Sequence, residues 1–139
     1  LCGLHKAGWT VCLSARTQTR ADRLALSFQA DHVAWSERHT VRPGLLVNTT
    51  PLGMSGPFQS LSPWKDTLHG ISLVYDLVYN PRQTPLLAQA ERERVEILHG
   101  LPMFVGQGLA QFERWTGLRF DFAQALALLE QTLGTKIRA

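Results

Sequence analysis

Short apolar runs alternate along the chain with longer segments whose apolar side chains recur at helical spacing. Five short runs, bounded by polar residues, glycine or proline, predict strands: Trp9–Ser14, His32–Trp35, Leu45–Asn48, Ile71–Leu77 and Val95–Leu98. The run 71–77 is apolar almost throughout, which is typical of a parallel strand buried on both faces of a sheet. The pattern therefore predicts a sheet that is covered on both sides.

Helices are predicted around these strands, at residues 1–7, 17–28, 84–94, 102–115 and from residue 121 onward. Capping residues mark their ends: Thr17, Thr84 and Asp121 at the starts, Gly8 and Gly117 at the stops. Pro85 fits the first helical position, and Gln124 fits a capping box with Asp121. Helices that alternate with buried strands predict an α/β fold with right-handed crossovers.

Two of these helices carry a clear apolar face. The face comprises Ala21, Leu24, Ala25 and Phe28 in the one, and Phe122, Ala125, Leu126, Leu129 and Leu133 in the other. The stretches 36–44 and 50–64 lack such a face and hold several glycines and prolines, so they are predicted to be connections.

Composition narrows the class of protein. The chain has 139 residues, of which 45% are hydrophobic and 18% charged, enough for one domain of ordinary size with a real core. The basic residues are scattered, so the net charge of +3 gives no sign of a nucleic-acid surface. No apolar run is long enough to span a membrane. Neither Cys2 and Cys12 nor the five histidines have a metal-binding spacing, and we expect reduced core thiols in a cytoplasmic protein without a metal.

Polar residues follow the strand 45–48 abruptly. Asn48, Thr49 and Thr50 come directly after three apolar residues and lead into Pro51 and Gly53. In an open α/β sheet, ligands bind at the carboxyl ends of the strands, so these side chains lie where a binding site is expected. Taken alone, the segment is better read as a plain exit from a strand into a turn.

A second candidate site follows the first predicted strand. Dinucleotide-binding folds of Rossmann type usually place an acid there for the ribose of NAD, whereas arginine suits the 2′-phosphate of NADP. Here the segment holds Arg16, Thr17 and Arg20 and no acid, which favours NADP. The alternative is two solvated arginines, although cations are disfavoured at a helix start unless an anion is bound. No G-x-G-x-x-G is present, and we expect that fingerprint to precede the helix 1–7.

Three longer motifs point to a family. Residues 48–54 read Asn-Thr-Thr-Pro-Leu-Gly-Met, residues 76–87 read Asp-Leu-Val-Tyr-Asn-Pro-x-x-Thr-Pro-Leu-Leu, and residues 100–108 read Gly-Leu-Pro-Met-Phe-Val-x-Gln-Gly. Phe112 and Trp115-Thr116-Gly117 follow. In order and spacing the chain closely resembles shikimate dehydrogenase, over almost its whole length. The resemblance implies an α/β, Rossmann-type parallel sheet flanked by helices, incomplete at its N-terminus.

The resemblance also implies how the adenosine half of the cofactor is held. The family grips the 2′-phosphate of NADP with an Asn-Arg-Thr-x-x-Arg motif. In this chain that motif falls on Ala15, Arg16, Thr17 and Arg20. Ala15 departs from the usual asparagine and loses one amide beside the adenosine, which weakens the expected preference for NADP over NAD.

The nicotinamide half and the substrate are implied to lie further along the chain. Asn48, Thr49 and Thr50 would run along the cofactor, Leu77 would offer its backbone to the carboxamide, and Gly100 would admit the ring. Tyr79 would reach the substrate pocket, and Gln107 would hydrogen-bond a shikimate hydroxyl. The small-molecule substrate would be shikimate or 3-dehydroshikimate.

The function implied is NADP-dependent interconversion of 3-dehydroshikimate and shikimate, in the chorismate pathway of aromatic amino acid biosynthesis, by a monomer or homodimer. The family's catalytic Lys and Asp lie in an N-terminal substrate domain, so no catalytic residue is expected in this chain. Lys65 and Asp66 are read as solvated loop residues.

Residues 1–118 would form part of the NADP domain, and the helix in 119–139 would pack toward the substrate domain. The alternatives are an NAD-preferring quinate/shikimate dehydrogenase and a non-catalytic nucleotide-binding fragment.

Overall fold

The computed structural model describes residues 2–136, which form two compact units that divide between Arg42 and Pro43. The strands pair in parallel and alternate with helices, as predicted, although they form two small sheets, one in each unit, and not a single one. None of the helices in the described range is both long and apolar enough to cross a bilayer. No cluster of three His, Cys, Asp or Glu side chains able to hold a metal ion occurs within residues 2–136.

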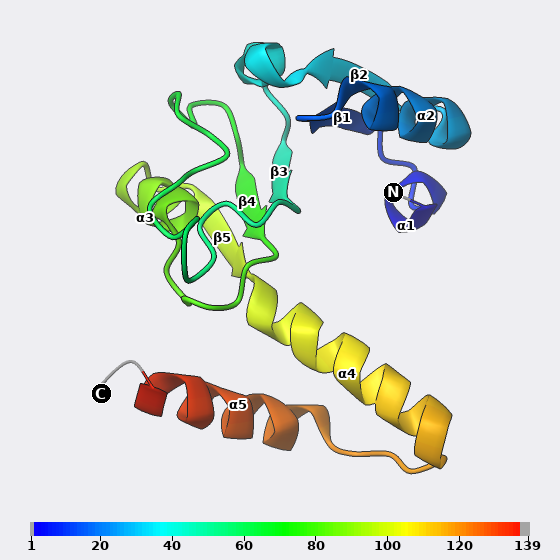
Figure 1. Cartoon of the computed structure of the whole chain (residues 1–139), viewed down its shortest axis with the longest axis vertical. Helices are drawn as coiled ribbons and strands as arrows, with labels where there is room; N and C mark the ends of the chain where they lie inside the picture. The colour runs from blue at the N-terminus through cyan, green and yellow to red at the C-terminus, as the bar shows by residue number, and fades with distance from the viewer. Residues whose placement is uncertain (1, 137–139) are drawn as a thin grey trace. The chain divides into compact units, whose positions relative to one another are not determined.

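The first unit is built around two parallel strands. Its elements are α1 (Cys2–Lys6), β1 (Cys12–Ala15), α2 (Gln18–Phe28), β2 (Asp31–Ala34) and a 3-10 helix, η1 (Trp35–Thr40) (Figure 1). In the register of the pair, the last residue of β1, Ala15, lies opposite the last residue of β2, Ala34. The ends of the two strands, and the residues that follow them, are therefore neighbours.

The residues predicted to cap the helices of this unit lie at the helix ends in the structure. Gly8 has a φ of 78°, and the N–H groups of Gly8 and Trp9 donate to the carbonyls of His5 and Leu4, which ends α1 in a Schellman motif. Thr17 is the N-cap of α2, although its side chain makes no capping hydrogen bond. Both β1 and β2 lie within one to three residues of their predicted bounds.

Two expectations about this unit are wrong. Leu24 was assigned to the apolar face of α2 but is 45% exposed. The buried residues of that helix are Ala21 and Ala25. Cys12 was expected in the core and is exposed, at the first position of β1. The connection predicted after β2 begins with the 3-10 helix η1.

The second unit contains a three-stranded parallel sheet in the order β3-β4-β5. Its elements are β3 (Leu45–Asn48), β4 (Leu73–Asp76), α3 (Pro85–Arg92), β5 (Glu96–His99), α4 (Gly100–Thr116) and α5 (Phe122–Lys136). In register, Asn48 lies opposite Asp76, and Asp76 lies opposite His99. The strands thus end together, and their polar terminal residues form one row at the carboxyl edge of the sheet.

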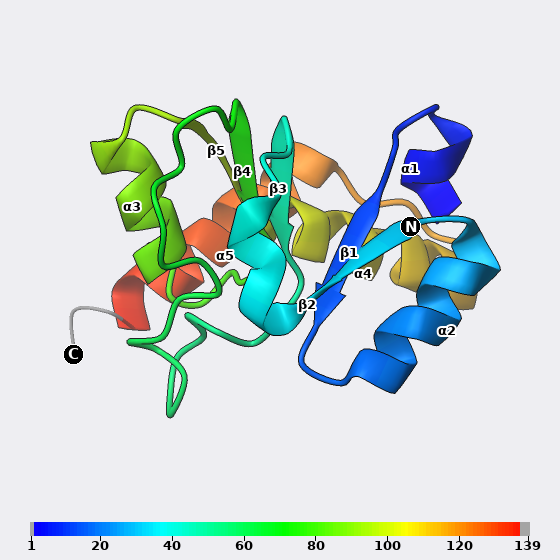
Figure 2. The ribbon, with the colours of Figure 1, turned by 90° about the horizontal axis from the view of Figure 1, so that it is seen from above.

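Helix α3 covers one face of this sheet and contributes Leu86, Leu87 and Ala90 to the core (Figure 2). Thr84 caps it as predicted, because its hydroxyl accepts a hydrogen bond from the N–H of Leu87, and Pro85 takes the first helical position. The buried cluster comprises Trp64, Leu68, Ile71, Val74, Leu86, Leu87 and Ala90. Each buried leucine contributes about 1.5–3 kcal/mol by leaving water. The long segment between β3 and β4 is thus anchored through Trp64 and Leu68.

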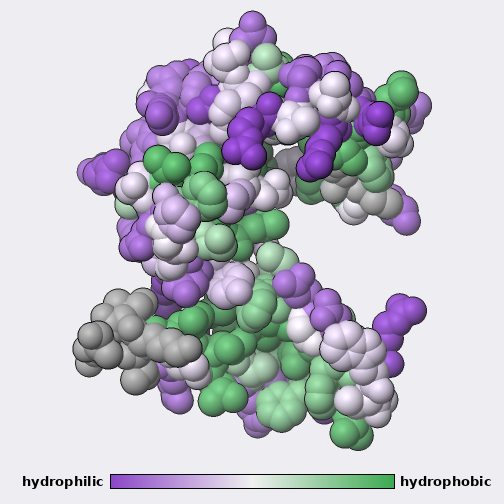
Figure 3. All heavy atoms as spheres, viewed as in Figure 1, coloured by the Kyte–Doolittle hydropathy of each residue, from purple (hydrophilic) through white to green (hydrophobic). Residues whose placement is uncertain are grey.

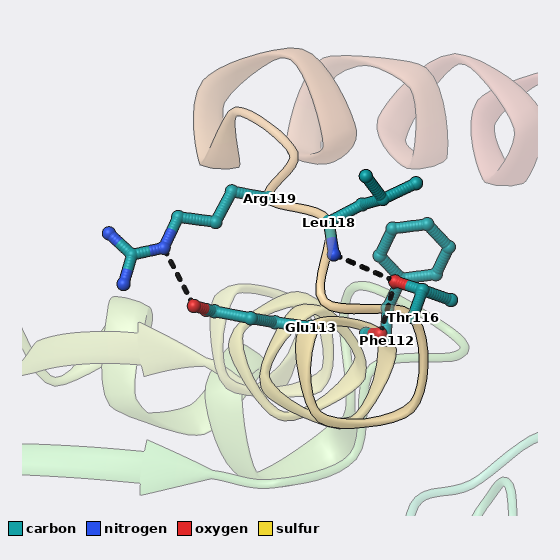
Figure 4. Close-up of polar contacts among 5 residues, drawn as sticks. All are labelled: Phe112, Glu113, Thr116, Leu118 and Arg119. Atoms are coloured by element: carbon teal, nitrogen blue, oxygen red, sulfur yellow. Dashed lines mark hydrogen bonds and ion pairs between the residues drawn. The ribbon is translucent and has the colours of Figure 1, made fainter.

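Helix α4 begins directly after β5 and ends at Gly117, which adopts a left-handed φ of 72°. Around this end, Thr116 Oγ1 donates to the carbonyl of Phe112 and accepts from the N–H of Leu118, while Arg119 pairs with Glu113 at 2.6 Å (Figure 4). Asp121 then caps α5, because its carboxylate accepts from the N–H of Gln124 at 2.9 Å. These contacts turn the chain so that α5 packs alongside α4.

Several large apolar side chains are exposed along α4, α5 and the connection between them. Figure 3 shows hydrophobic side chains gathered over these two helices. The large ones that are more than one-third exposed are Phe112, Trp115, Leu118, Phe120, Phe122 and Leu128. Phe122 belonged to the predicted apolar face of α5 but is 44% exposed, whereas the other members of that face are half-buried.

Candidate functional site

An open pocket of about 490 Å³ lies at the carboxyl ends of β3 and β4. Residues from the two strand ends form its walls: Thr49, Thr50, Pro51, Met54 and Ser55 on one side, and Leu77, Val78, Tyr79 and Asn80 on the other. The pocket is therefore where the polar exit from the strand 45–48 predicted a binding site. Thr49, Thr50, Leu77 and Tyr79, four of the predicted site residues, line it.

Asn48 supports this pocket from beneath. Its side chain is buried, with 3% of its surface exposed. The amide oxygen accepts from the N–H and the hydroxyl of Thr50, at 2.9 and 2.7 Å, and the amide nitrogen donates to Asp76 Oδ1 at 2.9 Å and to the carbonyl of Leu52 at 3.2 Å. All four hydrogen-bonding positions of the amide are used within the protein. Asn48 thus shapes the turn that carries Thr49 and Thr50.

Asp76 is the fully buried centre of the hydrogen-bond network below the pocket. One carboxylate oxygen accepts from Asn48 and from the N–H of Val78 at 3.0 Å, and the other accepts from the hydroxyl of Thr84 at 2.7 Å. Burial raises the pKa of this carboxyl above its usual value, and the hydrogen bonds from Thr84, Val78 and Asn48 offset part of the rise. The network joins the end of β3, the end of β4 and the start of α3.

Two glycines allow backbone segments to approach closely around this network. A Cβ atom on Gly100 would lie 2.2 Å from the carbonyl oxygen of Leu77, so only glycine fits beneath the segment that forms one wall of the pocket. Gly53 has a φ of 96° and packs against Thr84, where an added Cβ would lie 3.0 Å from the threonine Cβ. Gly100 itself does not line the pocket, so the structure provides it with a packing role.

Tyr79 is held in place from α4. Its ring stacks on Phe104, with the ring centroids 4.2 Å apart and the planes inclined by 21°. Its neighbour Asn80 accepts two hydrogen bonds from Ser55, one from the N–H at 2.9 Å to the Asn80 carbonyl and one from the hydroxyl at 3.2 Å to Oδ1. These contacts connect the two walls at one end of the pocket. Gln107 lies further along α4 and is exposed.

Arg16, Thr17 and Arg20 belong to the first unit, where the chain passes from β1 into α2. All three are exposed, and neither guanidinium forms a hydrogen bond or ion pair with any residue in the range 2–136. The first turn of α2 contains no acidic residue. Two unpaired cations therefore flank the free N–H groups of a helix start, an arrangement that attracts an anion.

Asp76, which organises the pocket, and its hydrogen-bond partner Thr84 at the start of α3 were not among the predicted site residues. Asp76 and Thr84 belong to the motif 76–87, but they were read only as strand and cap. The available signal was Asp76 itself, because an ionisable residue inside an apolar strand needs buried partners. Lys65 and Asp66 are exposed, as expected for loop residues.

Comparison with known proteins agrees with this geometry. Residues 100–130 match the family described as the Shikimate 5′-dehydrogenase C-terminal domain. Over 128 residues the chain is 44% identical to the NADP(+) shikimate dehydrogenase of Oleidesulfovibrio alaskensis, a match that spans 90% of this chain and 46% of that protein. The corresponding enzyme of Maridesulfovibrio salexigens is 38% identical over 124 residues, 88% of this chain and 46% of that protein.

A solved structure shows the same arrangement. The shikimate 5-dehydrogenase of Thermus thermophilus, in complex with NADP(H) and shikimate, superimposes with a TM-score of 0.79 at 34% identity, over 94% of this chain and 49% of that one. The fold is thus part of a Rossmann-type α/β domain with its pocket at the strand ends. The chain belongs to the shikimate dehydrogenase family. It spans about half the length of the curated relatives it matches.

Proposed function

We propose that this chain is the cofactor-binding part of an NADP-dependent shikimate dehydrogenase. The observation that carries the proposal is the 44% identity over 90% of the chain to a relative named for that activity and cofactor. The pocket at the ends of β3 and β4 supports it, because that is where the ligand of an open α/β sheet binds. When bound, the nicotinamide would accept or donate a hydride.

In this proposal the first unit holds the adenosine half of NADP. Arg16 and Arg20 would form charge-assisted hydrogen bonds to the 2′-phosphate, and the hydroxyl of Thr17 would add a further donor. The fit is supported by the two guanidinium groups, which have no partner within residues 2–136, at a helix start without acidic residues. The charge of the phosphate would offset the unfavourable placement of cations at that end of the helix dipole.

The second unit would hold the nicotinamide half. Thr49, Thr50, Leu77 and Tyr79 line the pocket. The Thr49 hydroxyl and the Leu77 carbonyl would face the carboxamide, and Thr50, whose N–H and hydroxyl bond Asn48, would shape that wall. The ring of Tyr79, stacked on Phe104, would face the substrate. Gly100 would act indirectly, because its missing side chain lets the backbone of Leu77 pack closely against it. Gln107 would bind a hydroxyl of shikimate from its exposed position on α4.

The Lys and Asp that exchange the hydroxyl proton are expected in the part of the relatives that this chain does not span. We assign residues 1–118 to the NADP domain and the helix in residues 119–139 to contact with the substrate domain. The exposed apolar side chains on α4 and α5 support such a contact, because a stable protein rarely leaves so many together in water. The cytoplasmic location and the monomeric or homodimeric state stay predictions.

An NAD-preferring quinate/shikimate dehydrogenase is the second candidate. Ala15 favours it, because this position lacks the amide that the family motif places beside the adenosine. The two arginines that follow favour NADP, since a guanidinium fork suits a phosphate better than the ribose hydroxyls of NAD.

Replacing Arg16 by alanine in the full-length protein tests the proposal. The KM for NADP in shikimate oxidation should rise roughly ten- to a hundredfold, as expected for a charge-assisted phosphate contact, while the KM for NAD changes little. Arg23→Ala is the matched control, because Arg23 is an exposed arginine on the same helix. Equal effects on both cofactors would refute the phosphate contact, and absence of shikimate oxidation by the unmodified protein would refute the function.

A further inference from the structure

Asp76 connects the two walls of the strand-end pocket through a single oxygen atom. Its Oδ1 accepts from Asn48 Nδ2 at 2.9 Å and from the N–H of Val78 at 3.0 Å. Asn48 in turn accepts hydrogen bonds from the N–H and the hydroxyl of Thr50. The Asp76 carboxylate therefore contacts one wall directly and is linked to the other through the side chain of Asn48. Val78 and Thr50 both line the pocket.

The direction of these hydrogen bonds is fixed by chemistry. A backbone N–H and an amide NH₂ can only donate, so Oδ1 must accept from both. The other oxygen, Oδ2, accepts from the hydroxyl of Thr84 at the start of α3, a residue that does not line the pocket. Thus Oδ1 of the carboxylate bonds residues of the pocket walls and Oδ2 bonds the start of α3. Substitutions can therefore separate an effect on the pocket from an effect on the helix.

We propose that Asp76 is a positioning residue for the nicotinamide half of the cofactor, because its Oδ1 sets the spacing between the Thr49–Pro51 turn and the Leu77–Tyr79 segment. The inference rests on the proposed function and goes beyond it by naming a buried side chain that touches neither cofactor nor substrate. The residues proposed to hold the adenosine half, Arg16 and Arg20, belong to the other compact unit and form no part of this network.

Three variants of the full-length protein separate positioning from stability. Asp76→Ala removes both oxygens. Asp76→Asn keeps an oxygen for Asn48 and Val78 and turns its NH₂ toward the Thr84 hydroxyl, which can accept. Thr84→Val is the matched control, because it removes the bond to Oδ2 and the cap of α3 while it leaves Oδ1 and both pocket walls untouched.

The readout is binding, measured by the change in NADPH fluorescence, with adenosine 2′,5′-bisphosphate as a probe of the adenosine half alone. Asp76→Ala should weaken NADPH binding by about tenfold or more and leave the bisphosphate unchanged, as expected when the two buried hydrogen bonds to Oδ1 are lost. Asp76→Asn should recover most of the lost affinity. Thr84→Val should unfold at lower temperature but bind NADPH within about threefold of the unmodified protein.

Folding is checked by near-ultraviolet circular dichroism and by tryptophan emission, to which Trp64, buried in the core of the same unit, contributes. If Asp76→Ala does not fold, Asp76→Ser replaces it, since its hydroxyl can accept one of the two N–H groups, and an intermediate loss is expected. Folded Asp76→Ala that binds NADPH like the unmodified protein overturns the inference, as does Thr84→Val with an equal loss. An unmodified protein that fails to bind NADPH overturns the proposed function and this inference together.

Discussion

Single residues at the strand ends decide the shape of the pocket. Asn48 and Asp76 are opposite each other in the register of β3 and β4, and both are buried. Each would be costly to bury alone, and each is satisfied by the other and by nearby backbone. Gly100 adds a steric requirement, since its missing side chain makes room for the carbonyl of Leu77.

Gly100→Ala is expected to destabilise the protein by roughly 1–3 kcal/mol or more, because its Cβ would overlap the backbone of Leu77 and no flexible side chain could move aside. Gly108→Ala is the matched control on the same helix, where nothing lies within 4 Å of the added Cβ. It should be neutral or stabilising by about 0.5–1 kcal/mol. Urea unfolding of the two variants measures both effects, and equal stabilities would contradict the steric role.

At the scale of elements, the segment between β3 and β4 is fastened to the end of α3. Glu93 accepts hydrogen bonds from Gln89, from the N–H of Leu68 at 2.6 Å and from the hydroxyl of Thr67 at 3.0 Å. The bonds from Gln89 and Leu68 lower the pKa of the Glu93 carboxyl below its usual value. The Glu93 carboxylate thus links the loop that contains Thr67 and Leu68 to the end of α3.

This lowered pKa makes a pH-dependent prediction. Because the folded pKa lies below the unfolded one, ionised Glu93 stabilises the fold above the unfolded pKa, and the contribution is lost as the pH falls through the folded pKa. Glu93→Gln should therefore lower the free energy of unfolding more at about pH 7 than at about pH 3. Glu96→Gln, an exposed glutamate on β5, serves as the control. An equal loss at both pH values would contradict the prediction.

The sequence predicted the elements better than their contacts. Both ends of β3 were predicted correctly, since an apolar run stops at a polar residue, whereas β4 is shorter than its run because pairing with β3 and β5 covers only residues 73–76. Thr49, Thr50, Leu77 and Tyr79 were placed at the pocket from motifs. The role of Asp76 was missed because it depends on Asn48, 28 residues earlier, and Thr84, 8 residues later.

At the scale of the whole molecule, the proposed cofactor contacts are divided between two compact units. The unit with Arg16 and Arg20 has a two-stranded sheet, and the unit with the pocket has a three-stranded one. The curated relatives are about twice as long as this chain. A complete reaction is therefore expected to require residues beyond these 139.

We expect the isolated 139-residue chain to reduce no NADP in the presence of shikimate. The reason is that the Lys and Asp that would move the hydroxyl proton are expected in the part of the relatives that the chain does not span, and positioned acid–base groups contribute about 10²–10⁴-fold to such rates. The absorbance of reduced nicotinamide measures the outcome, with the full-length protein as the positive control. Turnover above the enzyme-free blank would contradict this expectation.

The saturated amide of Asn48 has a consequence for redesign of the pocket. Because all four of its hydrogen-bonding positions are used internally, a substitution there is expected to remove hydrogen bonds that hold the turn. Thr49 and Met54 line the same pocket and are exposed, and their side chains take no part in this hydrogen-bond network. A library intended to accept altered nicotinamides should therefore vary these two positions and keep residues 48 and 76 fixed.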